Sequence, residues 1–379
     1  MIRYLVLALA MIAFGDGGSA RAGQPINIGM TMSLTGYLAL FDTGAVDGAK
    51  LAAQAINAKG GIDGHPIALH VLDNTSNAAT GVTVVNDLIN RYDVDAIASG
   101  ALSAQTVAIE PIVARNRVPV LTMSVIPSGM QWTFSMAEPP AQMLNLELDF
   151  AAHHLNAKRI AFLYSQTPYG QLGAKLIDAL AHQSGLEVAF DEGVAVAATD
   201  LTPQIARLKA TQPDAIVDFL TGPVHLVEAK AATTVGLTIP TIMATDDLST
   251  LQQAAGIYHK SYFVASPIQT YPDVPDPEVR TAVKAFLDAF KASGLDKREI
   301  SQAGEGWDLL HIVAHAFSPP TVMQSAKLRD AFLHLDYIGA YGRFQFQADD
   351  HTGQMHHPTT SQIAQFQDNQ VKVVGRNQP

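Results

Sequence analysis

Residues 26–36 read INIGMTMSLTG, and they begin the stretch that decides the fold. An apolar run typical of a buried strand ends at a loop of Ser, Thr and Gly, and a long alanine-rich segment with helical spacing follows. KGGI at 59–62 marks the end of that helix, and IALHVL at 67–72 predicts the next strand. This order places hydroxyl groups, backbone N–H groups and a helix N-terminus at the carboxyl edge of a strand, where open α/β sheets bind small ligands.

The same alternation of short apolar runs and amphipathic segments continues through most of the chain. Runs that are apolar on both faces predict parallel strands covered on both sides by helices. The predicted strands are residues 67–72, 96–98, 118–122, 160–164, 215–219, 239–244 and 262–265. Their alternation with helices predicts an α/β protein with doubly wound parallel sheets.

The pattern runs once through residues 26–135 and starts again at Arg159, after the Pro139-Pro140 step. Two such arrays exceed what one open sheet comfortably holds, so we predict two Rossmann-like lobes. A Pro-rich break at 267–277 and a change of character after Gly339 predict further passages between the lobes, three in total, which would let the lobes close on a ligand. We expect lobe 1 to contain residues 23–140 and 268–341, and lobe 2 to contain residues 141–267 and 342–379.

Residues 1–22 have the pattern of a secretory signal peptide. Arg3 is followed by an apolar stretch from Tyr4 to Phe14, and Ala20-Arg21-Ala22 forms a small-x-small cleavage site. We therefore expect an exported, periplasmic protein that is soluble once this segment is removed. The chain has no cysteine and so cannot form a disulfide, but a chain of 379 residues can rely on its hydrophobic core.

The amino-acid composition indicates which class of protein this is and which kind of partner it is not expected to bind. Hydrophobic residues make up 48% of the chain and charged residues 16%, which is typical of a globular protein. The formal net charge is −11 and no cluster of Lys and Arg interrupts it, so we expect no nucleic-acid partner.

In the first lobe, three loops at strand ends carry the candidate site residues. Tyr37 and Phe41 are large apolar groups in the loop after the first strand, where they favour a pocket wall over a solvated turn. Ser103 stands at the start of a helix, so its hydroxyl can cap that helix, and the free amides there can bind a carboxylate. In the next loop Ser124 offers a hydroxyl and Val125 only methyl groups.

In the second lobe, Tyr169 lies in the loop after the strand at 160–164, and Asp246-Asp247 follows the strand at 239–244. We expect one of the two aspartates to cap the following helix.

Enzyme signatures were sought without success. The chain has no Gly-x-Ser-x-Gly elbow, no Walker loop and no dinucleotide fingerprint. His311 and His315 have the spacing of a metal-binding pair on one helical face, but no third ligand is evident. We therefore expect no catalytic residue, no metal and no cofactor.

Several short motifs, in their order and spacing, resemble the periplasmic binding proteins of branched-chain amino-acid-type ABC transporters, the leucine/isoleucine/valine-binding family. The resemblance covers essentially the whole mature chain and implies a type I fold of two discontinuous lobes joined by three strands. The motifs are Leu34-Thr35-Gly36, Gly48-Ala49, Gly60-Gly61-Ile62, Ser103-Ala104-Gln105-Thr106, Val118-Pro119-Val120, Tyr169-Gly170, and Gly342 with Phe344.

The resemblance also implies roles for single residues. Members of the family hold the ligand carboxylate through a serine, a backbone amide and a threonine hydroxyl. Ser103 matches the serine, Met123 or Ser124 the amide position, and Val125 replaces the threonine. Phe41 matches the family's aromatic wall. Tyr169 and Asp246 match the pair near the ligand ammonium.

These matches leave the ligand open between two classes. Asp246 favours a ligand with an amino group, such as a branched-chain or other amino acid. The loss of a threonine hydroxyl at Val125 favours an aromatic or 2-oxo acid, which Tyr37, Phe41 and Tyr169 could hold by stacking.

We expect the substrate-binding component of an ABC importer, which captures a small carboxylate and presents it to a membrane permease and its ATPase. It would act as a monomer that is not embedded in the membrane. A ligand sensor for a chemoreceptor or regulator is the alternative, because the same pocket would serve it. A hydrolase on the same scaffold is less favoured, because no histidine falls in the strand-edge loops.

Overall fold

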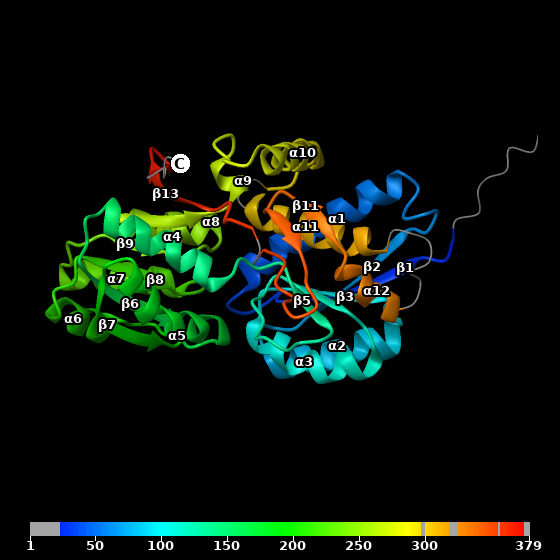
Figure 1. Ribbon diagram of the computed structural model, residues 1–379, viewed down its shortest axis with the longest axis horizontal. Helices are drawn as coiled ribbons and strands as arrows, with labels where there is room; N and C mark the ends of the chain where they lie inside the picture. Colours follow the sequence, from blue (N-terminus) through cyan, green and yellow to red (C-terminus); the bar gives the residue numbers. More distant parts are fainter. Residues whose placement is uncertain (1–22, 297–299, 318–324, 355–356, 375–379) are drawn as a thin grey trace, which may run out of the picture.

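The computed structural model describes residues 23–296, 300–317, 325–354 and 357–374, and residues 1–22, the expected signal peptide, lie outside them. Two α/β lobes lie side by side along the long axis of the molecule, as Figure 1 shows. Each lobe has its own sheet, so the predicted two-lobe α/β fold is confirmed.

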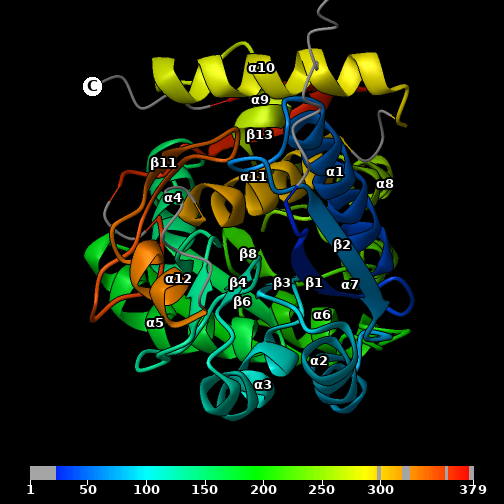
Figure 2. The same cartoon turned by 90° about the vertical axis from the view of Figure 1, so that its right-hand side faces the viewer.

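The first lobe contains a parallel five-stranded sheet in the order β2-β1-β3-β4-β5. Its strands are β1 (Ile26–Met32), β2 (Ile67–Asp73), β3 (Ala96–Ser99), β4 (Val120–Thr122) and β5 (Thr133–Ser135). Helices α1 (Ala39–Ala58) and α11 (Ile300–Ala316) cover one face of the sheet, and α2 (Ala78–Tyr92) and α3 (Ser103–Asn116) cover the other (Figure 2). The lobe also includes α10 (Pro277–Ser293), α12 (Ser325–Phe332) and the hairpin of β11 (Asp336–Ile338) and β12 (Arg343–Gln345).

The second lobe contains a seven-stranded sheet in the order β14-β13-β10-β9-β8-β6-β7. Its strands are β6 (Arg159–Ser165), β7 (Glu187–Val194), β8 (Ala215–Phe219), β9 (Thr241–Met243), β10 (Ser261–Ala265), β13 (Gln362–Gln367) and β14 (Gln370–Val373). Among the described strands of this sheet, the pairs β10–β13 and β13–β14 are antiparallel, and the other pairs are parallel. One face is covered by α4 (Pro140–His153) and α5 (Pro168–Gln183), and the other by α6 (Thr202–Ala210), α7 (Val224–Val235) and α8 (Leu248–Ile257).

Two glycines allow α1 and α11 to pack closely over the first sheet. A Cβ added to Gly48 would lie 1.7 Å from the carbonyl oxygen of Ala303, and one added to Gly306 would lie 1.8 Å from that of Ala45. Each helix therefore needs a residue without a side chain where it crosses the other. This crossing places the start of α11, with Glu305, near the loops after β1 and β3 that line the same cavity.

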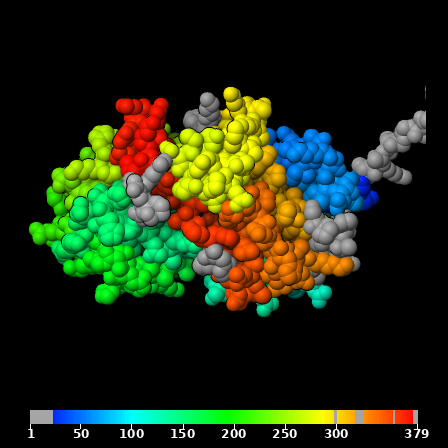
Figure 3. Space-filling model, turned by 45° about the horizontal axis from the view of Figure 1, so that its top comes forward, coloured from blue at the N-terminus to red at the C-terminus, as the bar shows by residue number. Residues whose placement is uncertain are grey.

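Within the described residues the chain passes between the lobes three times: after β5, between β10 and α10, and between β12 and β13. The short helix α9 (Pro267–Thr270) lies in the second passage. Figure 3 shows α10, in yellow, beside the red C-terminal strands over the junction of the two lobes.

The third passage begins later in the chain than we expected. Phe344 and Phe346 are buried in the core of the first lobe, and the amide of Gly353 donates to the carbonyl oxygen of Ser135 at 2.8 Å. The border expected between residues 341 and 342 is therefore too early, because the hairpin of β11 and β12 completes the first core.

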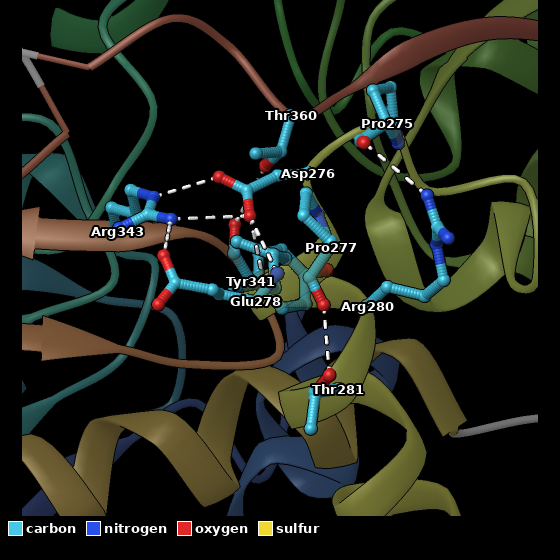
Figure 4. Close-up of polar contacts among 10 residues, drawn as sticks. Pro275, Asp276, Pro277, Glu278, Arg280, Thr281, Tyr341, Arg343 and Thr360 are labelled. Atoms are coloured by element: carbon cyan, nitrogen blue, oxygen red, sulfur yellow. Dashed lines mark hydrogen bonds and ion pairs between the residues drawn. The ribbon is translucent and has the colours of Figure 1, made fainter.

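An ion-pair cluster joins the second passage to the β11–β12 hairpin, as Figure 4 shows. Asp276 caps α10 by accepting from the amides of Glu278 at 2.8 Å and Val279 at 3.2 Å. Arg343 donates to Asp276 Oδ2 at 2.8 Å and also pairs with Glu278. These bonds from Arg343 and the α10 amides lower the pKa of Asp276.

We expect Arg343→Gln to lower the free energy of unfolding by about 1 kcal/mol or less, because the pair is partly exposed. A carboxyl with a lowered pKa stabilises the folded state above its unfolded pKa of about 3.9 and loses this contribution as pH falls through its folded pKa. Urea denaturation should therefore show a difference at pH 7 that shrinks near pH 3. Arg280→Gln is the control, since Arg280 donates to the backbone oxygen of Val274 and its effect should not follow this titration. A difference for Arg343→Gln that is the same at both pH values would contradict the expectation.

Candidate functional site

One cavity lies between the lobes at the carboxyl ends of strands from both sheets. Its volume is about 120 Å³. All residues that we selected from the sequence line it: Tyr37, Phe41, Ser103, Met123, Ser124, Val125, Tyr169 and Asp246. Their role in binding stays a prediction, but the fold brings them to one place.

Tyr37 and Phe41 reach the cavity because α1 begins at Ala39, within the predicted loop. The buried Asp42 ties this helix start to two loops by accepting from the amides of Ser33 at 2.6 Å and Ala101 at 3.1 Å. Burial raises the pKa of Asp42 to about 6, against the lowering effect of these bonds. Leu40, between Tyr37 and Phe41 in sequence, is 59% exposed because it lies on the outer face of the helix.

Ser103 is the first residue of α3 rather than its cap. The cap position is Leu102, and it forms no side-chain capping bond. The Ser103 side chain is 6% exposed and lines the cavity. The plain capping role is therefore wrong, and the hydroxyl stands beside the free amides of a helix N-terminus, where an anion is favoured.

The loop after β4 differs from what the resemblance implies. The amide of Met123 donates to the oxygen of Ser99 at 3.0 Å, and that of Ser124 donates to Oγ1 of Thr122 at 3.1 Å. The Ser124 hydroxyl donates to the carbonyl oxygen of Val125 at 3.1 Å. Both expected backbone donors are thus engaged within the protein. The amide of Val125, a residue that lines the cavity, has no hydrogen-bond partner among the described residues.

Tyr169 stands at the start of α5, where Thr167 caps the helix by accepting from the amide of Gly170 at 3.2 Å. Its ring stacks on Phe219 with centroids 4.4 Å apart, and its hydroxyl donates to Sδ of Met143 at 3.3 Å. One face of the ring is therefore already covered, which leaves the other face and the edge for a ligand.

Asp246 lines the cavity, whereas Asp247 caps α8 by accepting from the amide of Thr250 at 2.8 Å, as we expected of one of the pair. The amides of Gly222 and Asp247 donate to the Asp246 carboxylate at 2.5 Å and 2.7 Å. These bonds fix its orientation.

Behind Asp246 lies a fully buried histidine. His225 Nδ1 is 2.9 Å from Oδ2 of Asp218, and its Nε2 is 3.4 Å from Oδ2 of Asp246, close enough for an ion pair but not for a good hydrogen bond. Burial acts to lower the pKa of His225, but the two carboxylates raise it well above its ordinary value. The imidazolium therefore compensates charge behind the wall of the cavity.

The sequence reasoning missed two acids and a phenol in the lining: Glu138, Glu305 and Tyr341. Glu305 is flanked by Gly304 and Gly306 in a largely buried helix, and an acid in such a setting was a signal of a special role. Glu138 directly precedes the Pro139-Pro140 step that we used only as a lobe boundary.

The described residues contain no group of three or more His, Cys, Asp or Glu side chains arranged to hold a metal ion. In the same residues, none of the helices combines the length and apolar character needed to cross a membrane.

Known proteins share this architecture. A relative called Leu/Ile/Val-binding protein homolog 3, from Brucella melitensis, is 22% identical over 218 residues, which are 55% of this chain and 58% of that protein. The chain thus matches little more than half the length of this relative. An amino acid binding protein of Pseudomonas aeruginosa is 24% identical over 78% of this chain and 79% of its own length.

Among solved structures, the branched-chain amino acid transporter substrate-binding protein LivJ from Streptococcus pneumoniae, in complex with isoleucine, superposes with a TM-score of 0.78. It is 25% identical, with 92% of this chain and 98% of LivJ covered. The family model for periplasmic binding proteins matches residues 25–370. The chain belongs to the periplasmic binding protein family.

Proposed function

We propose that this protein is the periplasmic substrate-binding component of an ABC importer and that it captures a small carboxylate between its lobes. The observation that supports it best is a cavity lined by residues of both lobes that the sequence also selected, at the passages where the chain crosses between them. The isoleucine in the LivJ structure supports a ligand of amino-acid size.

In this proposal, Ser103 and the first amides of α3 hold the ligand carboxylate, with the amide of Val125 as a further donor. Tyr37 and Phe41 cover its side chain. Tyr169 and Asp246 face its far end from the second lobe, and an amino acid would place its ammonium there.

Closure of the two lobes would bury the ligand, and only the closed form would match the permease and its ATPase. The ligand would then act by shifting the population from the open to the closed form. A thermal-shift screen with leucine, phenylalanine, phenylpyruvate, benzoate and 4-hydroxybenzoate tests capture. Uptake of the best labelled probe by a strain that lacks the gene tests delivery, and unchanged uptake would contradict the transport role.

We expect Ser103→Ala to weaken binding of the best probe by about 1–3 kcal/mol, because it removes a hydrogen bond to a charged group. Isothermal titration calorimetry measures the loss. Ser124→Ala is the matched control, since that hydroxyl is engaged by a backbone oxygen and its removal should cost less. Equal affinities for wild type and Ser103→Ala would remove Ser103 from the site.

A further inference from the structure

The polar lining of the cavity is strongly one-sided in charge. The described lining residues include three carboxyl side chains, those of Glu138, Asp246 and Glu305, and no Lys, Arg or His. Asp246 is already bonded by two amides and backed by His225. Glu138 and Glu305 each keep one buried carboxyl oxygen without a hydrogen-bond partner among the described residues.

Glu305 is presented to the cavity by the close packing of α11 on α1 next to Gly306. Its side chain is 6% exposed, and its Oε2 has no hydrogen-bond partner among the described residues. The charged groups that act on it, Asp42 and Asp308, are also acidic. A buried carboxyl oxygen that lines a cavity without a partner is costly unless a ligand supplies one.

Glu138 approaches the same region from the first passage between the lobes. Its Oε2 accepts from the hydroxyl of Ser361 at 2.6 Å, whereas its Oε1 has no partner among the described residues. Tyr341 lines the same cavity as the two acids. Burial raises the pKa of its phenol, and the negative charges of Glu305 and, to a smaller degree, Glu138 raise it further.

We propose that Glu305 and Glu138 form a second polar subsite that binds a cationic nitrogen, so that the ligand is a small carboxylate with a basic side chain. This inference rests on the proposed function, because it describes the side-chain group of a ligand whose carboxylate is held near Ser103. An ammonium or guanidinium group would donate to the unpartnered oxygen of Glu305, and the charge of Glu138 in the same lining would favour it further.

Protonation supplies a further readout. Burial raises the pKa of both Glu138 and Glu305, and for Glu305 the neighbouring acids Asp42 and Asp308 add to the shift. A cation favours the ionised carboxyl, so binding of a basic ligand near pH 7 should release protons to the buffer.

The test compares lysine, ornithine and arginine with leucine, phenylalanine and benzoate by calorimetry on the full protein. We expect at least one basic probe to bind 10-fold or more tightly than each neutral-side-chain probe. Glu305→Gln and Glu138→Gln should each weaken that basic probe about 10-fold. Titrations in phosphate and Tris buffers should show proton release that is smaller in Glu305→Gln.

Glu187→Gln is the matched control, since this exposed residue of β7 pairs with Arg159 outside the cavity and should leave affinity unchanged. Thermal unfolding of each variant shows whether it is folded. Tighter binding of a neutral-side-chain probe, or wild-type affinity for the basic probe in both folded variants, would overturn the subsite and leave the proposed function standing. If no probe of either set binds, the proposed function fails together with this inference.

Discussion

His225→Leu is expected to lower the free energy of unfolding by about 3–5 kcal/mol, because it leaves two buried carboxylates facing each other without a cation. His225 is fully buried between Asp218 and Asp246. Glu147 and Glu228 face the same network, and burial followed by the charge of Asp218 raises the pKa of both, that of Glu228 to about 8. They offer no positive charge to replace the imidazolium.

The pH dependence of this loss has a definite sign. A histidine whose folded pKa is raised stabilises the folded state fully below its unfolded pKa of about 6.5, and this contribution is lost as pH rises through the folded pKa. The difference between wild type and His225→Leu in urea denaturation should therefore be largest near pH 6 and decrease toward pH 9.

Two further variants separate the contribution of the His225 charge to stability from that of its packing and from the effect of replacing any histidine. His225→Gln keeps a hydrogen-bond donor without the charge. Its free energy of unfolding should therefore lie between that of wild type and that of His225→Leu. His153→Leu replaces an exposed histidine and should change stability by about 0.5 kcal/mol or less. Equal stability of His225→Leu and wild type at pH 6 would refute the buried ion-pair assignment.

The second large effect is expected for Gly306→Ala, which should lower the free energy of unfolding by about 1–3 kcal/mol. The added methyl group would collide with the backbone oxygen of Ala45, and backbone cannot move aside as a flexible side chain can. The helices α1 and α11 would have to separate, and Glu305 beside this position would move with α11. Loss of affinity for a cavity ligand should accompany the loss of stability.

Gly256→Ala is the matched control because Gly256 lies in α8 with nothing within 4 Å of an added Cβ. There the substitution should raise stability by up to about 1 kcal/mol, since alanine favours a helix more than glycine does. Thermal or urea denaturation of both variants measures the contrast. A stabilising Gly306→Ala would show that the two helices are not in close contact.

Much of the fold could be predicted because buried parallel strands appear as continuous apolar runs. The predicted strands are all present, with small changes at their ends, as in β4, which begins at Val120 rather than residue 118. Strand β7 was not predicted from the sequence, because it forms an edge of the sheet and most of its residues are exposed or half-buried. Strand β5 was not predicted either, because Thr133–Ser135 has only one apolar residue, Phe134, although all three residues are buried.

The amino-acid sequence by itself determined the two α/β lobes and the loops that line the cavity, because strand ends and helix starts are local features. Ser103 and Tyr169 could be selected for this reason. Only the tertiary structure decided which amides are already bonded, as at Met123 and Ser124, and that Glu138, Glu305 and Tyr341 line the same cavity. These contacts involve residues far apart in the chain, which helix packing and the passages between the lobes bring together. A local sequence pattern therefore cannot predict them.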